Sequence, residues 1–245
     1  RNFSTPSLPS TNPKSSRTPA SRHSVNARTN AAATLHQHVT SARDRLIAAG
    51  IAAGEAEMDA RLLAQHALGW NAARFFRDMT EAPPGGFDAA FDRLIARRAE
   101  REPMAYVLGA QEFWNLTFDV TPDVLIPRPE SEGIIEAVQQ LLPEPSTVFS
   151  LADVCTGSGC LAIVLATLYP DARVVATDMS RPALEVAARN ASRHEVARRV
   201  AFVQADVLHG IDGVFDLIVS NPPYVPERDR LNLPPEVRDH EPGLA

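Results

Sequence analysis

The segment Asp153-Val-Cys-Thr-Gly-Ser-Gly159 joins two apolar stretches and decides the fold class. Residues 147–155 predict a strand, and residues 161–168 predict the helix that follows it. The glycines between them permit positive φ angles and let a ligand approach the backbone closely. Read from Gly157, the sequence also fits the G-x-G-x-x-A pattern of dinucleotide-binding turns, which ends at Ala162. A strand, a glycine turn and a helix in this order are typical of a nucleotide-binding sheet.

The alternation of strands and helices continues after this turn. We expect further strands at residues 173–177, 200–204 and 214–219, and a helix at residues 182–194 that Ser180 caps. This order is that of a doubly wound parallel sheet. The sequence therefore predicts an α/β fold with a Rossmann-like sheet.

Acidic residues follow the second and third expected strands. Asp178 can accept hydrogen bonds from both hydroxyl groups of a ribose. Its alternative role is a helix cap, for which Ser180 is better placed. Asp206 either lies near an adenine or is a solvated loop acid, and the sequence favours neither interpretation over the other. The glycine turn alone does not separate NAD from S-adenosylmethionine, but with Asp178 it predicts a nucleotide-like cofactor.

The tetrapeptide Asn221-Pro-Pro-Tyr224 follows the fourth expected strand, at the sheet edge where ligands bind in such folds. The prolines stiffen the loop and hold Asn221 extended. The Asn221 side-chain oxygen and the Pro222 carbonyl can accept both N–H groups of a planar amino group, and Tyr224 offers it a flat surface. We therefore predict methyl transfer from S-adenosylmethionine to a planar NH₂ group, with Asn221, Pro222 and Tyr224 as catalytic residues.

This chemistry needs no strong base. An amide nitrogen is a poor nucleophile, so we expect positioning and electrostatic support of the shifting charge to provide most of the rate. An Asn-Pro dipeptide by itself indicates only a turn. Its place after the fourth strand, in a sheet with the glycine turn and Asp178, favours the catalytic interpretation.

The chain ahead of the sheet divides by composition and period. Residues 1–30 contain no Asp or Glu and few large apolar residues, which predicts a disordered tail; an organellar transit peptide is the second interpretation. Residues 31–105 show helical spacing and predict a small bundle. Residues 106–128 predict a hairpin connector, and residues 129–245 the methyltransferase domain. We expect Arg97, Arg98 and Arg101, at the end of the last bundle helix, to form a solvated face, with contact to a partner as the alternative.

The composition limits the function classes. A net charge of −6 argues against binding to nucleic acid by bulk electrostatics. Cys155 and Cys160 are too few for a disulfide framework or a zinc cluster, and we expect no metal site. No apolar run approaches the roughly 18 residues of a membrane span. We expect a soluble protein in a reducing, cytoplasmic setting.

Three motifs in the connecting region resemble a known family. They are Tyr106-Val-Leu-Gly, Glu112-Phe-Trp-Asn-Leu and Val124-Leu-Ile-Pro-Arg-Pro-Glu130. Together with residues 153–159 and 221–224 they resemble the HemK family, the release factor glutamine methyltransferases. The resemblance implies a helical domain that helps to dock the release factor. It also implies a Rossmann-like domain that methylates the glutamine of the factor's Gly-Gly-Gln loop.

The resemblance runs from about residue 35 to the end of the chain and implies a site residue by residue. We expect a monomer that acts on a protein, with no direct contact to nucleic acid or membrane. The implied cofactor is S-adenosylmethionine. Its contacts fall on Cys155, Thr156, Gly157, Ser158, Gly159, Asp178, Asp206, Val207 and Asn221, and the substrate contacts fall on Asn221, Pro222, Pro223 and Tyr224.

The sequence departs from the family at two places. Cys155 stands where the family usually has glycine, and we expect the thiol to fit if the backbone there is extended. Methyltransferases of this class resemble a seven-stranded sheet, whereas this chain ends after the fourth expected strand. We therefore expect an incomplete sheet with an unpaired apolar edge at residues 214–219, poor stability and weak activity. Equal thermal stability of this chain and a longer one would contradict that expectation.

Other functions remain open at this point. Methyltransferases that act on the amino group of a nucleobase also use Asn-Pro-Pro-Tyr, because a flipped base presents the same planar group. The negative net charge, the helical domain and the connector argue against nucleobase methyltransferases. A ribosomal-protein glutamine is a closer alternative target. An inactive cofactor-binding interaction module is the alternative from another class, and the intact Asn221 counts against it.

Overall fold

The computed structural model describes residues 1, 2, 4 and 32–243. Apart from residues 1, 2 and 4, the tail expected at residues 1–30 lies outside the described residues. The described residues from Ala33 onward form one compact unit. Among the described residues, no helix is both long and apolar enough to cross a membrane.

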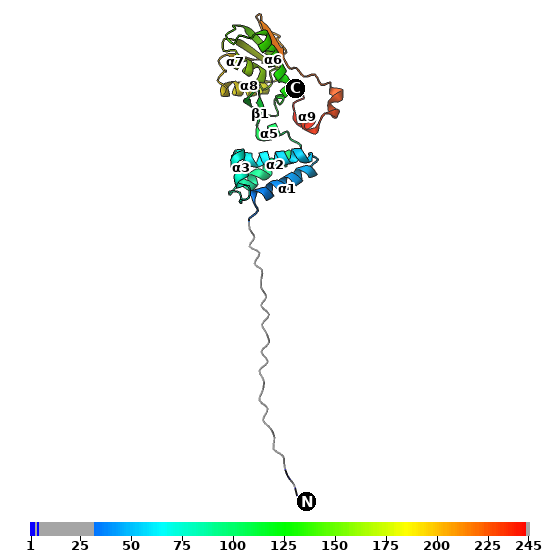
Figure 1. Ribbon diagram of the computed structural model, residues 1–245. Helices are drawn as coiled ribbons and strands as arrows, with labels where there is room; N and C mark the ends of the chain where they lie inside the picture. Colours follow the sequence, from blue (N-terminus) through cyan, green and yellow to red (C-terminus); the bar gives the residue numbers. More distant parts are fainter. Residues whose placement is uncertain (3, 5–31, 244–245) are drawn as a thin grey trace. The chain divides into compact units, whose positions relative to one another are not determined.

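The helices that precede the first strand begin and end at local signals. Thr34 starts the first with a capping box, in which its hydroxyl and the Gln37 side chain bond reciprocally to backbone N–H groups. Gly69, at φ 62°, ends the second, and Asn71 caps the third. Their apolar faces share one core, so the predicted bundle is confirmed. These helices are α1 (Leu35–Ala48), α2 (Ala53–Leu68), α3 (Ala72–Asp78), α4 (Phe87–Ala99) and the short α5 (Met104–Leu108) (Figure 1).

The predicted hairpin is present as the antiparallel strands β1 (Ala110–Phe113) and β2 (Leu116–Asp119). Its two-residue turn holds Trp114 and Asn115 at φ 51° and 59°. Positive φ at both central positions matches the right-handed twist of paired strands, as in type I′ turns. The hairpin then leads through the 3₁₀ helix η1 (Pro129–Ser131) into α6 (Glu132–Leu141).

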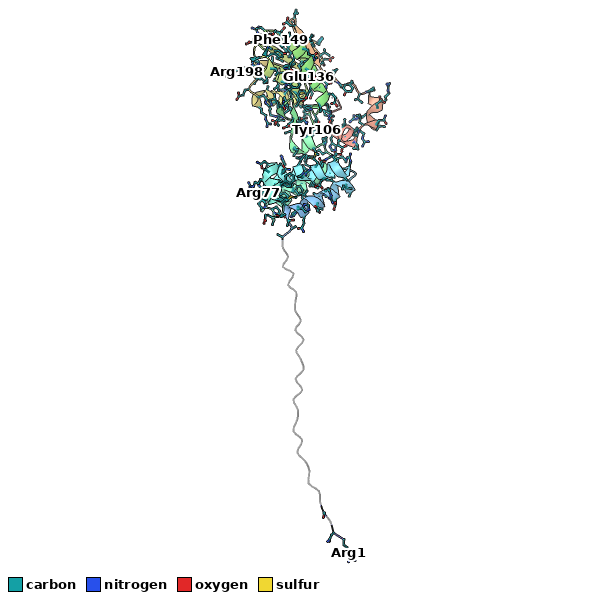
Figure 2. The ribbon with its side chains drawn as sticks, in the orientation of Figure 1. Arg1, Arg77, Tyr106, Glu136, Phe149 and Arg198 are labelled. Carbon is teal, nitrogen blue, oxygen red and sulfur yellow. The ribbon has the colours of Figure 1, made fainter. Side chains whose placement is uncertain are left out.

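Tyr106 on α5 connects the bundle to the loop after the hairpin. It is buried, and its hydroxyl donates to the Val124 carbonyl at 2.6 Å (Tyr106 is labelled in Figure 2). Burial raises the pKa of Tyr106, so the hydroxyl stays protonated and remains a donor. Two of the motifs that carry the family resemblance, at residues 106–109 and 124–130, are therefore in direct contact.

The remaining strands form a parallel sheet, so the predicted α/β fold is confirmed. In the described residues the order is β5-β4-β3-β6, and β3 is central and buried along most of its length. Among the described strands, β6 pairs only with β3, which leaves the expected unpaired edge within this part of the chain, and Ile218 there is 55% exposed. This strand is shorter than the predicted residues 214–219. The strands are β3 (Ser150–Val154), β4 (Arg173–Asp178), β5 (Val200–Gln204) and β6 (Leu217–Ser220).

Helices α7 (Cys160–Leu168) and α8 (Arg181–Arg193) connect successive strands of the sheet. α7 is buried along almost its whole length, as expected of an apolar helix packed between layers. Ser180 caps α8, as predicted. After β6 the chain continues as η2 (Glu227–Asn232) and α9 (Pro235–His240). This last segment returns to the bundle through its charged side chains.

Arg98 on α4 is buried, so the expected solvated face is wrong for this residue. Only 1% of it is exposed, and its guanidinium group donates to three carboxylates. The distances are 2.7 Å to Asp59, 2.5 Å to Glu55 and 3.1 Å to Glu236 on α9. Burial lowers the pKa of Arg98, but these hydrogen bonds and charges outweigh it and raise the pKa overall. Arg98 therefore joins the bundle to the segment after β6.

Replacing Arg98 by alanine should destabilise the protein strongly, because it leaves Asp59 as an unpaired buried carboxylate. Breaking a buried ion pair in this way costs roughly 3–5 kcal/mol. The measurement is the free energy of unfolding in urea. Arg77→Ala (Arg77 is labelled in Figure 2) removes an exposed ion pair with Asp78 and should leave the midpoint nearly unchanged. Equal midpoints for the two variants would contradict the assigned role of Arg98.

Candidate functional site

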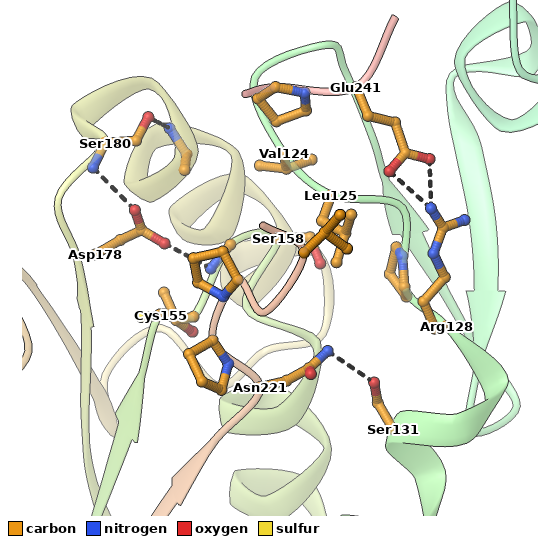
Figure 3. A pocket seen from close by; sticks show the side chains of 18 of the residues that line it. Val124, Leu125, Arg128, Ser131, Cys155, Ser158, Asp178, Ser180, Asn221 and Glu241 are labelled. Carbon is orange, nitrogen blue, oxygen red and sulfur yellow. Dashed lines mark hydrogen bonds and ion pairs between the residues drawn. The ribbon is translucent and has the colours of Figure 1, made fainter. Parts of the chain in front are cut away.

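A cavity of about 640 Å³ opens at the carboxyl edge of the sheet (Figure 3). Its size lies in the range of pockets that bind small molecules. The structure brings most of the predicted site residues to its lining. Gly159, Asp206 and Val207 are not among the lining residues. Those that line the cavity are Cys155, Thr156, Gly157, Ser158, Asp178, Asn221, Pro222, Pro223 and Tyr224.

The turn after β3 is built from left-handed backbone. Cys155, Gly157 and Gly159 have φ angles of 61°, 54° and 82°. The expectation of an extended backbone at Cys155 is therefore wrong, and the residue that replaces glycine stands where glycine would be least strained. A Cβ at Gly157 would meet no atom within 4 Å, so the cavity side of the turn is open.

Gly159 has a packing role. A Cβ built there would lie 3.0 Å from the side chains of both Ala187 on α8 and Ile163 on α7. The absence of a side chain at this position lets the two helices approach each other over the turn. This explains why the last glycine of the motif does not line the cavity.

Asp178 at the end of β4 is anchored at both carboxylate oxygens. One oxygen accepts from the Gly157 N–H and the other from the Ser180 N–H, each at 2.9 Å. The Ser180 hydroxyl accepts from the Ala183 N–H, so Ser180 and not Asp178 is the side-chain cap of α8. Each Asp178 oxygen retains a lone pair with which to accept from a ligand in the cavity. The carboxylate is thus fixed in place and points its charge at the site (Figure 3).

Asp153 stabilises the glycine turn by hydrogen bonds, a role that the sequence motif did not indicate. It is fully buried, and one carboxylate oxygen accepts from the Thr156 hydroxyl at 2.6 Å and from the Ala162 N–H at 3.1 Å. The other oxygen has no hydrogen-bond partner among the residues that the structure describes. Burial raises the pKa of Asp153 to about 7, against the hydrogen bonds from Thr156 and Ala162.

Asn221 lines the cavity, directly after β6. Its side-chain NH₂ group donates to the Ser131 hydroxyl at 3.1 Å. Pro222, Pro223 and Tyr224 follow it along the cavity wall and are exposed, and Tyr224 is 79% exposed. The surface of the tetrapeptide therefore remains accessible to a large substrate.

The segment after β6 supplies cavity residues that sequence reasoning missed. Arg128 donates to both carboxylate oxygens of Glu241 at 2.6 and 2.7 Å, and Glu241 is 8% exposed. Burial raises the pKa of Glu241, while Arg128 opposes this rise. Arg128 lies within the motif that carried the family resemblance, but no pattern in the sequence indicated Glu241. Val237 and Arg238 of α9 line the same side of the cavity.

Two family descriptions match the chain. Residues 37–109 match the PrmC N-terminal domain, and residues 135–233 match the methyltransferase small domain. The release factor glutamine methyltransferase of Mycolicibacterium smegmatis is 43% identical over 213 residues, which cover 86% of this chain and 73% of that relative. Its counterpart in Cereibacter sphaeroides is 42% identical over 201 residues, which cover 82% of this chain and 70% of that relative.

The sheet, the glycine turn and the family matches define a methyltransferase of the Rossmann-like class, whose cofactor is S-adenosylmethionine. The similarity extends through both the helical bundle and the sheet. The chain belongs to the family of release factor glutamine methyltransferases.

The raised pKa of Asp153 predicts a pH dependence of stability. A carboxyl group with a higher pKa in the folded protein than in the unfolded chain stabilises the fold when protonated. That contribution is lost as the pH rises from about 4 to about 7. Asp153→Asn keeps the shape but does not ionise, so its stability relative to the wild type should increase over this window. Urea denaturation of both proteins at several pH values measures the difference. A constant difference would contradict the assignment.

Proposed function

We propose that this protein transfers a methyl group from S-adenosylmethionine to the side-chain amide nitrogen of the glutamine in the Gly-Gly-Gln loop of peptide chain release factors. The observation that carries the proposal is one cavity that holds the glycine turn, Asp178 and Asn221 together. The names of the relatives from Mycolicibacterium smegmatis and Cereibacter sphaeroides support the choice of target.

The residues at the turn fit the cofactor. The open space beside Gly157 would admit the cofactor next to the backbone of residues 155–158. Asp178, fixed by two N–H groups, would accept hydrogen bonds from the ribose hydroxyls. Asp206 and Val207, in the loop after β5, would lie on the adenine side. When bound, S-adenosylmethionine supplies a methyl group attached to a positively charged sulfur atom.

The substrate amide would be held by acceptors on the tetrapeptide. The Asn221 side-chain oxygen and the Pro222 carbonyl would each accept one N–H of the glutamine amide, which fixes the nitrogen in the plane of the group. Pro223 and the exposed ring of Tyr224 would contact the flat amide and the neighbouring peptide. Transfer would form a carbon–nitrogen bond as the carbon–sulfur bond breaks, with loss of one amide proton to solvent, and the aligned acceptors would stabilise the charge that develops on the amide.

The helical bundle would contribute to docking of the release factor. We propose residues 31–105 as the docking domain, residues 106–128 as its connector and residues 129–245 as the catalytic domain. The contact between Arg98 and Glu236 supports a docking role for the bundle, because it joins the bundle to the segment that lines the cavity. The protein would act as a cytoplasmic monomer on a protein substrate, with no direct contact to nucleic acid or membrane, in keeping with the net charge of −6.

A labelling experiment tests the target. The protein is incubated with radiolabelled S-adenosylmethionine and, separately, with a release factor, the same factor with alanine in place of the Gly-Gly-Gln glutamine, a ribosomal protein and nucleic acid. We expect label on the unmodified factor only. Label on nucleic acid or the ribosomal protein alone, or equal label on both forms of the factor, would contradict the proposal.

Two variants should separate cofactor binding from transfer. Asn221→Ala removes an acceptor from the substrate amide, so kcat should fall by about 10²–10³-fold while the Kd for S-adenosylmethionine changes little. Asp178→Ala removes the ribose acceptor and should raise that Kd by about tenfold or more. Calorimetric titration and single-turnover kinetics measure the two effects. A normal kcat for Asn221→Ala, or an unchanged Kd for Asp178→Ala, would remove that residue from its role.

A further inference from the structure

Ser131 occupies a helix-capping position without capping the helix. It is the last residue of η1 and stands at the N-cap of α6, yet its side chain accepts no hydrogen bond from the backbone of that helix. Serine at such a position ordinarily bonds to the second or third N–H of the helix. The hydroxyl instead accepts from the Asn221 NH₂ group at 3.1 Å, across 90 residues of sequence (Figure 3).

In this arrangement the hydrogen bond to Ser131 uses the donor edge of the Asn221 amide. An asparagine side chain has one edge that donates and one that accepts. With the NH₂ group bonded to Ser131, the side-chain oxygen accepts no hydrogen bond from the described residues and remains available to the cavity. If the amide were rotated by half a turn, its NH₂ group would instead meet the N–H groups of an incoming amide. Two donors facing each other cannot form a hydrogen bond.

Ser131 is itself held rigidly. It is 7% exposed, and its backbone N–H donates to the Arg128 carbonyl at 3.0 Å. The next residue, Glu132, accepts from the Trp114 N–H at 2.8 Å, which fixes the start of α6 to the hairpin turn. Arg128 is anchored in turn by Glu241. The backbone at Ser131 is therefore held in place, with its hydroxyl oxygen at 3.1 Å from the Asn221 NH₂ nitrogen.

We propose that Ser131 is a positioning residue for methyl transfer, which keeps the oxygen of Asn221 directed at the substrate amide. The inference rests on the proposed function, because it assigns Asn221 as an acceptor of the glutamine N–H. In this proposal Ser131, which lines the cavity, acts through Asn221 and not by a contact of its own with the methyl donor or the substrate. Its loss should therefore lower the rate of transfer and leave cofactor binding intact.

The test compares Ser131→Ala, Ser131→Thr and Ser220→Ala. Ser131→Ala should lower kcat by about tenfold to a hundredfold through misorientation, with KM and Kd for S-adenosylmethionine within about twofold of wild type. Ser131→Thr keeps the hydroxyl and should restore most of kcat. Ser220→Ala is the control. Ser220 directly precedes Asn221, and its hydroxyl donates to the Val154 carbonyl and not to the Asn221 side chain. This variant should stay within about twofold of wild type.

A purely structural role for Ser131 predicts a different pattern. Ser131→Ala would then lower the melting temperature and the affinity for S-adenosylmethionine together with kcat, and that pattern would overturn the inference. A kcat equal to wild type would overturn it as well. Failure of Ser131→Thr to recover activity, with a normal melting temperature, would show that the hydroxyl is not the group that matters.

A second measurement does not depend on activity. The side-chain NH₂ signals of Asn221 in the ¹⁵N-labelled protein are assigned by their loss in Asn221→Ala. We expect them to shift and to exchange faster with solvent in Ser131→Ala, but not in Ser220→Ala. Unchanged signals in Ser131→Ala would overturn the inference. If the wild type labelled no release factor at all, the proposed function would fail, and the NMR comparison would still decide whether the hydrogen bond exists.

Discussion

The site depends on the parallel register of three strands. Val154, the last residue of β3, pairs with Thr177 of β4 on one side and Ser220 of β6 on the other. The residues that follow these three are Cys155, Asp178 and Asn221. Because parallel strands end at the same edge of a sheet, this register places the glycine turn, the carboxylate and the amide next to one another. A slip of one residue would point each of these side chains to the opposite face.

The sequence predicted this part well because its signals are local. The apolar strand, the glycine turn and the helix after it follow one another within a few residues, and a sheet of this type has one edge at which ligands bind. The cap at Ser180 and the presence of a hairpin were likewise predictable from neighbouring residues, whereas the two-residue turn of the hairpin was not predicted. The choice between Ser180 and Asp178 as the cap of the following helix depended on neighbouring residues in the same way. Because Ser180 was the better cap, Asp178 was assigned to the ligand.

Contacts between distant segments were not predictable in this way. Arg98 was expected in solvent because nothing near it in the sequence indicates that Asp59 and Glu236 converge on it. Ser131 and Glu241 carry no motif of their own, and only the folded chain brings them to the cavity. The left-handed backbone at Cys155 was missed for a different reason. A residue other than glycine rarely adopts a positive φ angle, so the presence of cysteine at position 155 did not indicate this backbone conformation.

The central claim is that the edge of this sheet holds a glutamine amide against Asn221 while Asp178 holds the cofactor. A crystal structure with S-adenosylhomocysteine and a peptide containing Gly-Gly-Gln tests it most directly. The account predicts that the glutamine nitrogen lies within hydrogen-bond distance of the Asn221 side-chain oxygen, with the ribose hydroxyls on Asp178. A glutamine bound elsewhere, or an Asn221 amide that presents its NH₂ group to the peptide, would contradict it.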